Sequence, residues 1–237
     1  MKKLLLFFVL TTSFSFAQDV KTTLTYLVHK PSKVTKHTPV LIVMHGYGSN
    51  EMDLFPISKE VAKDFLIFSL QAPRTTKNGG YCWFDLEFLP QQKFKYDYSQ
   101  MKEARDKVAS FISAACSAYK ADSTKVFLLG FSQGATMSYE IAVNAPAKVR
   151  GIVALSGLMM PETFASNADW NKVAKVKIFI AHGTADNVVN ISDSQKCAEQ
   201  FKSKKIDDLS YSTYPIGHSI DGNEIKDVYT WLEKYKK

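Results

Sequence analysis

A serine stands between two glycines in the stretch Gly-Phe-Ser-Gln-Gly, residues 130–134, after an apolar run and before a helical pattern. A sharp strand-to-helix turn can hold such a serine hydroxyl clear of a sheet, where it acts as a nucleophile. The flanking glycines then leave room for the crowded backbone of the turn. A serine at this position also suits a helix cap. Ser132 is therefore a candidate nucleophile, with helix capping as the rival interpretation.

A nucleophilic serine needs a general base to take its proton and an acid to orient that base. In chains with this turn, the acid and then the histidine follow the serine. Of the five histidines, His182 and His218 follow Ser132, and Asp186 lies between them. Chain order therefore predicts Ser132, Asp186 and His218 as catalytic residues. The alternatives are a turn-forming aspartate at Asp186 and a solvated loop histidine at His218.

The oxyanion of an acyl-transfer intermediate needs two backbone N–H groups. One is expected from Gln133, which follows the serine, and the other from a loop after an earlier strand. The stretch VLIVMHGYGSN, residues 40–50, has an apolar run followed by two glycines that flank Tyr47. We therefore expect the Tyr47 and Gln133 amides to form the oxyanion hole. His45 precedes Ser132 in the chain and is interpreted as a structural residue beneath this loop.

The elements that position these residues are short apolar runs alternating with helical patterns. Apolar runs without alternation are typical of parallel strands buried on both faces. The pattern predicts an α/β fold with a mostly parallel central sheet flanked by helices on both faces. Strands are expected at residues 22–28, 40–44, 65–70, 125–130, 150–155, 176–181 and 209–214, and helices at 98–119, 132–145, 191–202 and 220–235.

Residues 72–99 interrupt this alternation with a long insertion between a strand and the next helix. Long loops in compact domains are usually functional or disordered. The insertion is dense in aromatic residues, which favours an ordered, packed loop. These aromatic residues are Tyr81, Trp83, Phe84, Phe88, Phe94, Tyr96 and Tyr98.

The N-terminal stretch MKKLLLFFVLTTSFSFAQDV has lysines, a short apolar core and then small residues. That order is typical of a secretory signal peptide, and the alternative is a buried N-terminal helix. We expect a signal peptide at residues 1–17, cleavage after Ala17, and a secreted or periplasmic protein. Residues 18–237 are then expected to form a single domain, with no membrane span.

The formal net charge of +7 comes from basic residues scattered among acidic ones. Scattered charges are typical of a solvated surface, so no nucleic-acid partner is expected. Cys82, Cys116 and Cys197 have neither zinc-site spacing nor the pattern of a disulfide framework, so no metal site is expected. One disulfide remains possible from the sequence, but its pairing is open, as is the oligomeric state.

The motifs together resemble the phospholipase/carboxylesterase family of α/β-hydrolases, which includes the acyl-protein thioesterases. The matching stretches are VMHGYGSN, APRTTKNGGYCWFD, VFLLGFSQGATMS, IAHGTADNVV and GHSI. The resemblance implies hydrolysis of carboxylic esters or thioesters through a Ser–Asp–His triad, without a cofactor. It also implies that the region of Trp83 lines the acyl pocket.

These patterns predict a secreted serine carboxylesterase that acts on a small-molecule or polysaccharide-linked ester with a short, medium or lipid-type acyl group. A feruloyl or acetyl-polysaccharide esterase is the alternative, because Trp83 and Phe84 suit an aromatic ring and an acyl chain equally well. A further alternative is a hydrolase fold that binds a ligand without catalysis. Most insertion aromatics are expected to pack the insertion onto the domain, whereas Trp83 is expected to contact substrate.

Overall fold

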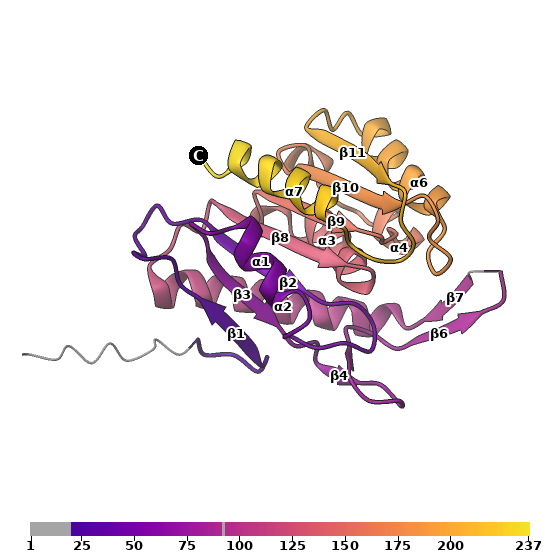
Figure 1. Ribbon diagram of the computed structural model, residues 1–237, viewed down its shortest axis with the longest axis horizontal. Coiled ribbons are helices and arrows are strands. Elements are labelled where there is room, and N and C mark those ends of the chain that lie inside the picture. The colour runs from indigo at the N-terminus through magenta and orange to yellow at the C-terminus, as the bar shows by residue number, and fades with distance from the viewer. Residues whose placement is uncertain (1–19, 92) are drawn as a thin grey trace, which may run out of the picture.

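The computed structural model describes residues 20–91 and 93–237, so the predicted signal peptide lies outside the described residues. A seven-stranded sheet runs through this part of the chain in the order β1-β3-β2-β8-β9-β10-β11 (Figure 1). Strand β1 is antiparallel to β3, and the other neighbouring pairs are parallel. The strands are β1 (Tyr26–His29), β2 (Val40–Met44), β3 (Leu66–Leu70), β8 (Val126–Phe131), β9 (Gly151–Leu155), β10 (Lys177–Gly183) and β11 (Leu209–Tyr214).

The central strands are buried on both faces, as their apolar runs predict. In β2 all five residues are buried. Ile42 and Met44 belong to one hydrophobic core, and Leu41 and Val43 belong to another. Because neighbouring side chains of a strand point to opposite faces, each apolar run supplies both cores at once.

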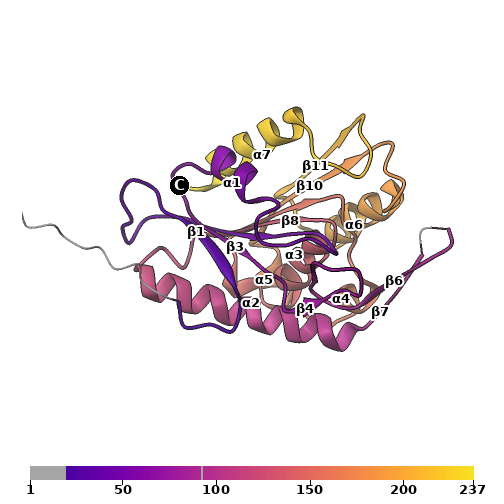
Figure 2. The ribbon, with the colours of Figure 1, turned by 60° about the horizontal axis from the view of Figure 1, so that its bottom comes forward.

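Helices cover both faces of the sheet (Figure 2). Residues of α2 (Tyr98–Tyr119), α3 (Gln133–Asn144) and α6 (Ile191–Ser203) belong to the core of Ile42. Residues of α1 (Phe55–Val61) and α7 (Gly222–Tyr235) belong to the core of Leu41. The predicted fold, a mostly parallel sheet between two helical layers, is confirmed. Short turns of helix complete the chain at α4 (Pro161–Phe164), α5 (Trp170–Val173) and the 3-10 segment Pro146–Lys148.

The insertion is ordered and packs against the domain, as its aromatic residues predict, but it forms two β-hairpins rather than the expected loop. Strands β4 (Arg74–Thr75) and β5 (Tyr81–Cys82) form the first, and β6 (Leu86–Leu89) and β7 (Lys93–Tyr96) form the second. The β6–β7 hairpin extends away from the sheet (Figures 1 and 2). It is stabilised by a cross-strand aromatic pair, with the Phe88 and Phe94 rings 5.6 Å apart, although Phe88 is 54% exposed.

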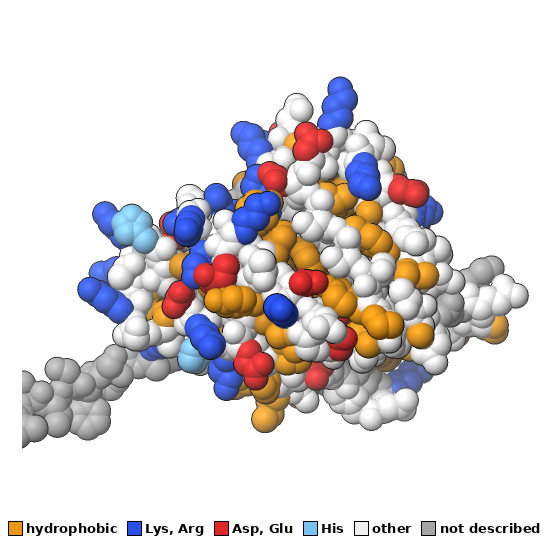
Figure 3. All heavy atoms as spheres, turned by 45° about the horizontal axis from the view of Figure 1, so that its top comes forward, with side chains coloured by type: hydrophobic (Ala, Val, Ile, Leu, Met, Phe, Trp, Pro, Cys, Tyr) orange, Lys and Arg blue, Asp and Glu red, His pale blue; other side chains and the backbone are white. Residues whose placement is uncertain are grey.

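Charged side chains of both signs are mixed on the surface, as the sequence predicts (Figure 3). On the face drawn in Figure 3, basic side chains lie among acidic ones rather than in one uninterrupted basic patch. The three cysteines are all buried and unpaired, so the possible disulfide is not formed. Among residues 20–91 and 93–237, no helix has the length and apolar character needed to cross a membrane.

Glu224, in the first turn of α7, makes the stability of the protein depend on pH. Its side chain is 1% exposed, and burial, followed by the charge of Asp221, raises its pKa from 4.5 to about 8. The folded state therefore binds this proton more tightly than the unfolded state does. This stabilisation is complete below about pH 4.5 and is lost as the pH rises through about 8.

We expect Glu224→Gln to raise the free energy of unfolding at pH 9 by on the order of 3 kcal/mol, because the amide needs no deprotonation. Urea unfolding at pH 5 and pH 9 measures the effect. The exposed Glu199→Gln on α6 is the matched control and should keep the wild-type pH dependence. Equal pH dependence in Glu224→Gln and the wild type would contradict this account.

Candidate active site

Ser132 lies in the turn between β8 and α3, in a backbone conformation that is rare for a residue with a side chain. Its φ is 54° and its ψ is −115°, and it occupies the N-cap position of α3 without a capping hydrogen bond from its side chain. The hydroxyl Oγ lies instead 2.9 Å from Nε2 of His218. The geometry therefore favours the nucleophile interpretation over the helix-cap interpretation.

The glycines beside Ser132 are required by the close approach of backbone segments. A Cβ atom on Gly130 would lie 2.2 Å from the carbonyl oxygen of Gly134. A Cβ atom on Gly134 would lie 2.0 Å from the carbonyl oxygen of Met44 in β2. No side chain fits at such distances, so the strained turn needs glycine on both sides.

Ser132, His218 and Asp186, which chain order selects, lie in one hydrogen-bonded line. Nδ1 of His218 is 2.7 Å from Oδ2 of Asp186, while Nε2 faces the hydroxyl of Ser132. The three residues follow the carboxyl ends of β8, β10 and β11, where open α/β sheets place their sites. The buried Asp186 carboxylate accepts from Nδ1–H, which leaves the Nε2 lone pair free to accept the serine proton.

The second oxygen of the Asp186 carboxylate is held by the backbone. Its Oδ1 accepts hydrogen bonds from the amides of Val188 and Val189, at 2.8 and 2.9 Å. The fully buried His182 adds a contact, since its Nε2 lies 3.0 Å from the Val189 carbonyl oxygen and 3.3 Å from Oδ2 of Asp186. Sequence reasoning excluded His182 as the base and missed this position beside the acid. The one signal in the sequence was that His182 precedes Asp186 by only four residues.

The loop after β2 lies against the nucleophile, as the expected oxyanion hole requires. A Cβ atom on Gly46 would lie 3.4 Å from Cβ of Ser132. Within the described residues, the Tyr47 and Gln133 amides donate no hydrogen bond. Both amides are therefore free to receive an oxyanion.

The side chain of Gln133 has a second role, which the sequence did not indicate. Its Oε1 accepts a hydrogen bond from the Trp83 amide at 2.8 Å, and its Nε2 donates to the Phe84 carbonyl at 2.7 Å. The residue after the nucleophile therefore fastens the insertion to the turn that carries Ser132.

His45 is a structural residue, as predicted. The Ala72 amide donates to its Nε2 at 3.1 Å, and its Nδ1 lies 2.7 Å from the Gly46 carbonyl oxygen. Nε2 is thus the acceptor and Nδ1 the donor. Burial lowers the pKa of His45, which keeps the ring neutral. The ring links the loop after β2 to the start of the insertion.

A narrow apolar cleft opens beside Ser132. Its volume is about 30 Å³, which holds one or two water molecules. Phe88 and Phe94 of the β6–β7 hairpin line it, as do Leu158 and Met160, which precede α4. The remaining lining residues are Tyr47, Phe84, Leu86, Gln133, Thr136, Val188 and Val189.

Trp83 is not among the residues that line this cleft, so the expectation that it contacts substrate finds no support in the geometry. Its ring is fully buried, and its indole N–H donates to the His45 carbonyl oxygen at 2.9 Å. A tryptophan with its polar atom satisfied inside the core is a packing residue. Phe84, the other predicted contact, does line the cleft.

A hydrogen bond joins the β6–β7 hairpin to α4. The Tyr96 hydroxyl of β7 donates to Oε2 of Glu162 in α4 at 2.7 Å. Burial and this carboxylate raise the pKa of Tyr96 above its usual value, so the hydroxyl keeps its proton. The hairpin is therefore joined to the helix that begins directly after Met160.

Comparisons with known proteins agree with this geometry. The sequence profile of the family described as Phospholipase/Carboxylesterase matches residues 28–236. Acyl-protein thioesterase 1 of Debaryomyces hansenii is 29% identical over 167 residues, which are 68% of this chain and 72% of the relative. Acyl-protein thioesterase 1 of Mycosarcoma maydis is 25% identical over 88% of this chain and 95% of its own. The carboxylesterase of Bacillus cereus has a TM-score of 0.77 at 19% identity, covering 91% of this chain and 96% of that one.

Proposed function

The chain belongs to the phospholipase/carboxylesterase family of α/β-hydrolases, and we propose that it is a carboxylesterase whose catalytic residues are Ser132, His218 and Asp186 and that its N-terminal residues direct its secretion. The family and its relatives make the protein a serine hydrolase that acts on ester bonds. The observation that carries the assignment of residues is the continuous hydrogen-bonded line from Asp186 through His218 to Ser132.

In the proposed mechanism, Nε2 of His218 takes the Ser132 proton as Oγ attacks the acyl carbon. Asp186 stabilises the imidazolium that forms and holds its orientation. The amides of Tyr47 and Gln133 donate to the oxyanion. His218 then gives the proton to the leaving alcohol, and water hydrolyses the acyl-enzyme by the same route.

We expect a fluorophosphonate probe to label the wild-type protein once per chain, at Ser132, because the probe reacts with serines that a neighbouring base activates. Mass spectrometry of the labelled peptide measures this, alongside hydrolysis of p-nitrophenyl acetate. Ser138, a buried serine of the same helix, is the internal control and should stay unlabelled. Failure of the folded protein to react would favour a binding protein without catalysis.

Secretion is proposed from residues 1–17, whose charged, apolar and small residues follow the order of a signal peptide. We expect the protein exported by a bacterial host to begin at Gln18, as intact-mass measurement would show. Leu6→Arg interrupts the apolar core and should leave the uncleaved chain inside the cell. Recovery of wild-type protein beginning at Met1 from the cytoplasm alone would contradict secretion.

A further inference from the structure

A second hollow lies between the two hairpins of the insertion, and it differs in character from the cleft at Ser132. It is a groove of about 880 Å³ lined by charged, hydroxyl and aromatic side chains, against about 30 Å³ for the apolar cleft. Tyr47, in the loop after β2, and Leu86 of β6 line both hollows, so the two hollows adjoin at these residues. An ester bound at Ser132 has an acyl part and an alcohol part, and the two hollows can each hold one of them.

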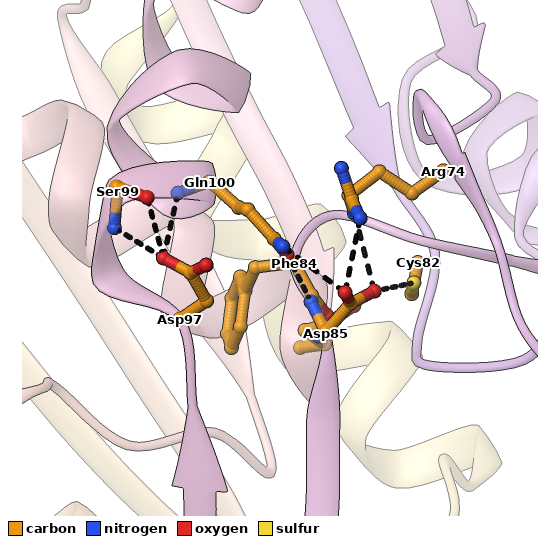
Figure 4. Close-up of polar contacts among 8 residues, drawn as sticks. Arg74, Cys82, Phe84, Asp85, Asp97, Ser99 and Gln100 are labelled. Carbon is orange, nitrogen blue, oxygen red and sulfur yellow. Dashed lines mark hydrogen bonds and ion pairs between the residues drawn. The ribbon is translucent and has the colours of Figure 1, made fainter.

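Four of the six charged residues that line the groove are paired with one another. The Arg74 guanidinium donates to both oxygens of Asp85, from Nε at 3.1 Å and from Nη2 at 2.9 Å. Gln100 holds Asp85 from the other side, donating Nε2–H to its carboxylate and accepting from its amide (Figure 4). On the second hairpin, Lys95 lies 3.7 Å from Glu87. The groove therefore presents charged groups of both signs without a patch of one charge, and the Arg74–Asp85 pair is held in place by Gln100.

Hydroxyl and aromatic groups complete the groove. Thr75 and Thr76 of the first hairpin line one side, and Tyr96 and Tyr98 line the other. Tyrosine rings offer an apolar face together with a polar edge. Ionised groups that are already oriented make strong hydrogen bonds to neutral hydroxyls. Such a lining suits a ligand with many hydroxyl groups, apolar ring faces and no net charge.

We propose that this groove binds the saccharide part of a carbohydrate ester whose acyl group is as small as acetyl. The inference rests on the proposed function, because Ser132 is the nucleophile. An anionic alcohol such as a phosphodiester would need a lining of net positive charge, whereas the three basic residues of the groove (Arg74, Lys77 and Lys95) are balanced by three acidic ones (Asp85, Glu87 and Asp97). An aliphatic alcohol would need an apolar groove. The narrow cleft, of about 30 Å³, favours a small acyl group.

The reaction balances without a further reactant besides water. Oγ of Ser132 bonds to the acetyl carbon, and the bond from that carbon to the saccharide oxygen breaks. The serine proton passes through His218 to the saccharide oxygen, which leaves as a hydroxyl. Water then cleaves the acetyl-enzyme to acetate and restores the serine.

The test compares kcat/KM for an O-acetylated oligosaccharide, a feruloylated one and ethyl acetate. Ethyl acetate carries the same acyl group on an alcohol too small to reach the groove. We expect the acetylated oligosaccharide to be preferred over ethyl acetate by about 100-fold, because binding of the remote part of a substrate lowers the barrier. The deacetylated oligosaccharide should inhibit ethyl acetate hydrolysis competitively.

Two variants locate the preference in the groove. Arg74→Gln removes a charged donor, and Thr75→Trp fills the groove from an exposed strand without breaking a described side-chain hydrogen bond. Each should lower the ratio of the two acetate kcat/KM values about tenfold. Lys172→Gln, which removes the cation of an exposed ion pair with Asp169 on α5, is the matched control and should keep the wild-type ratio. Thermal unfolding confirms that each variant is folded.

The outcomes separate the two proposals. A folded enzyme that hydrolyses ethyl acetate and the acetylated oligosaccharide with equal kcat/KM overturns the saccharide groove but leaves the esterase proposal intact. Preference for the feruloylated oligosaccharide overturns the small acyl group. Unchanged ratios in both groove variants overturn the location. A folded wild type that hydrolyses none of the three esters overturns the proposed function itself.

Discussion

Ser132→Ala is expected to lower kcat for p-nitrophenyl acetate by about 10⁴-fold, because no other group can form the acyl-enzyme. The substitution removes the hydroxyl oxygen of Ser132, which lies 2.9 Å from Nε2 of His218 in the wild type. The oxyanion amides and the cleft remain, so a residual rate above the uncatalysed reaction should persist. Steady-state kinetics, with labelling by the fluorophosphonate probe, measures the loss.

The matched control for this variant is Ser138→Ala. Ser138 is also a buried serine of α3, and its hydroxyl donates to the Gly134 carbonyl oxygen at 3.1 Å within the helix. Loss of this hydroxyl should change kcat less than threefold, because it removes only one side-chain hydrogen bond within the helix. If Ser132→Ala retained more than a tenth of the wild-type kcat, another nucleophile would have to be sought.

Asp186→Asn is expected to lower kcat by about 10³–10⁴-fold while the fold stays intact. The Val188 and Val189 amides donate to Oδ1 and will keep the asparagine carbonyl oxygen at that position. The amide NH₂ then occupies the place of Oδ2 and faces Nδ1 of His218. An NH₂ group donates there, so the imidazole proton moves to Nε2, which can no longer accept the Ser132 proton.

This result separates Asp186 from the other acids in the sequence. Asp169→Asn changes an aspartate that caps α5 through a hydrogen bond to the Lys172 amide, and it should leave kcat within twofold of the wild type. The pH profile of kcat/KM gives a second readout, because its acid limb reports the protonation of the residue that must be neutral to act as the base. A kcat for Asp186→Asn within tenfold of the wild type would rule out the role proposed for this carboxylate.

Much of the fold could be predicted because buried parallel strands have a distinct sequence pattern. The stretches at β2 and β11 match their predicted bounds, and α2 begins after its capping residue Asp97 as the helical spacing requires. Strand β1 begins at Tyr26, later than the alternation from Thr22 predicts. It is an edge strand with half-buried residues, so its apolar pattern is weak at both ends.

The line of Ser132, Asp186 and His218 could be predicted because chain order and strand ends constrain it. The surroundings could not, since aromatic composition does not reveal which ring faces a cleft. Trp83 and Phe84 are neighbours in sequence, yet Phe84 lines the cleft whereas Trp83 does not. The hairpins escaped prediction because their strands are short and one of them stands largely outside the cores.

The hydrogen bond between Tyr96 and Glu162 joins two segments that lie 66 residues apart in the sequence. The β6–β7 hairpin is a two-stranded sheet of its own, separate from the seven-stranded sheet that carries Ser132. Its place beside the cleft is therefore set by side-chain contacts such as this one, and the acyl side of the site has a different structural basis from the line of Ser132, His218 and Asp186, which the ends of the central strands position.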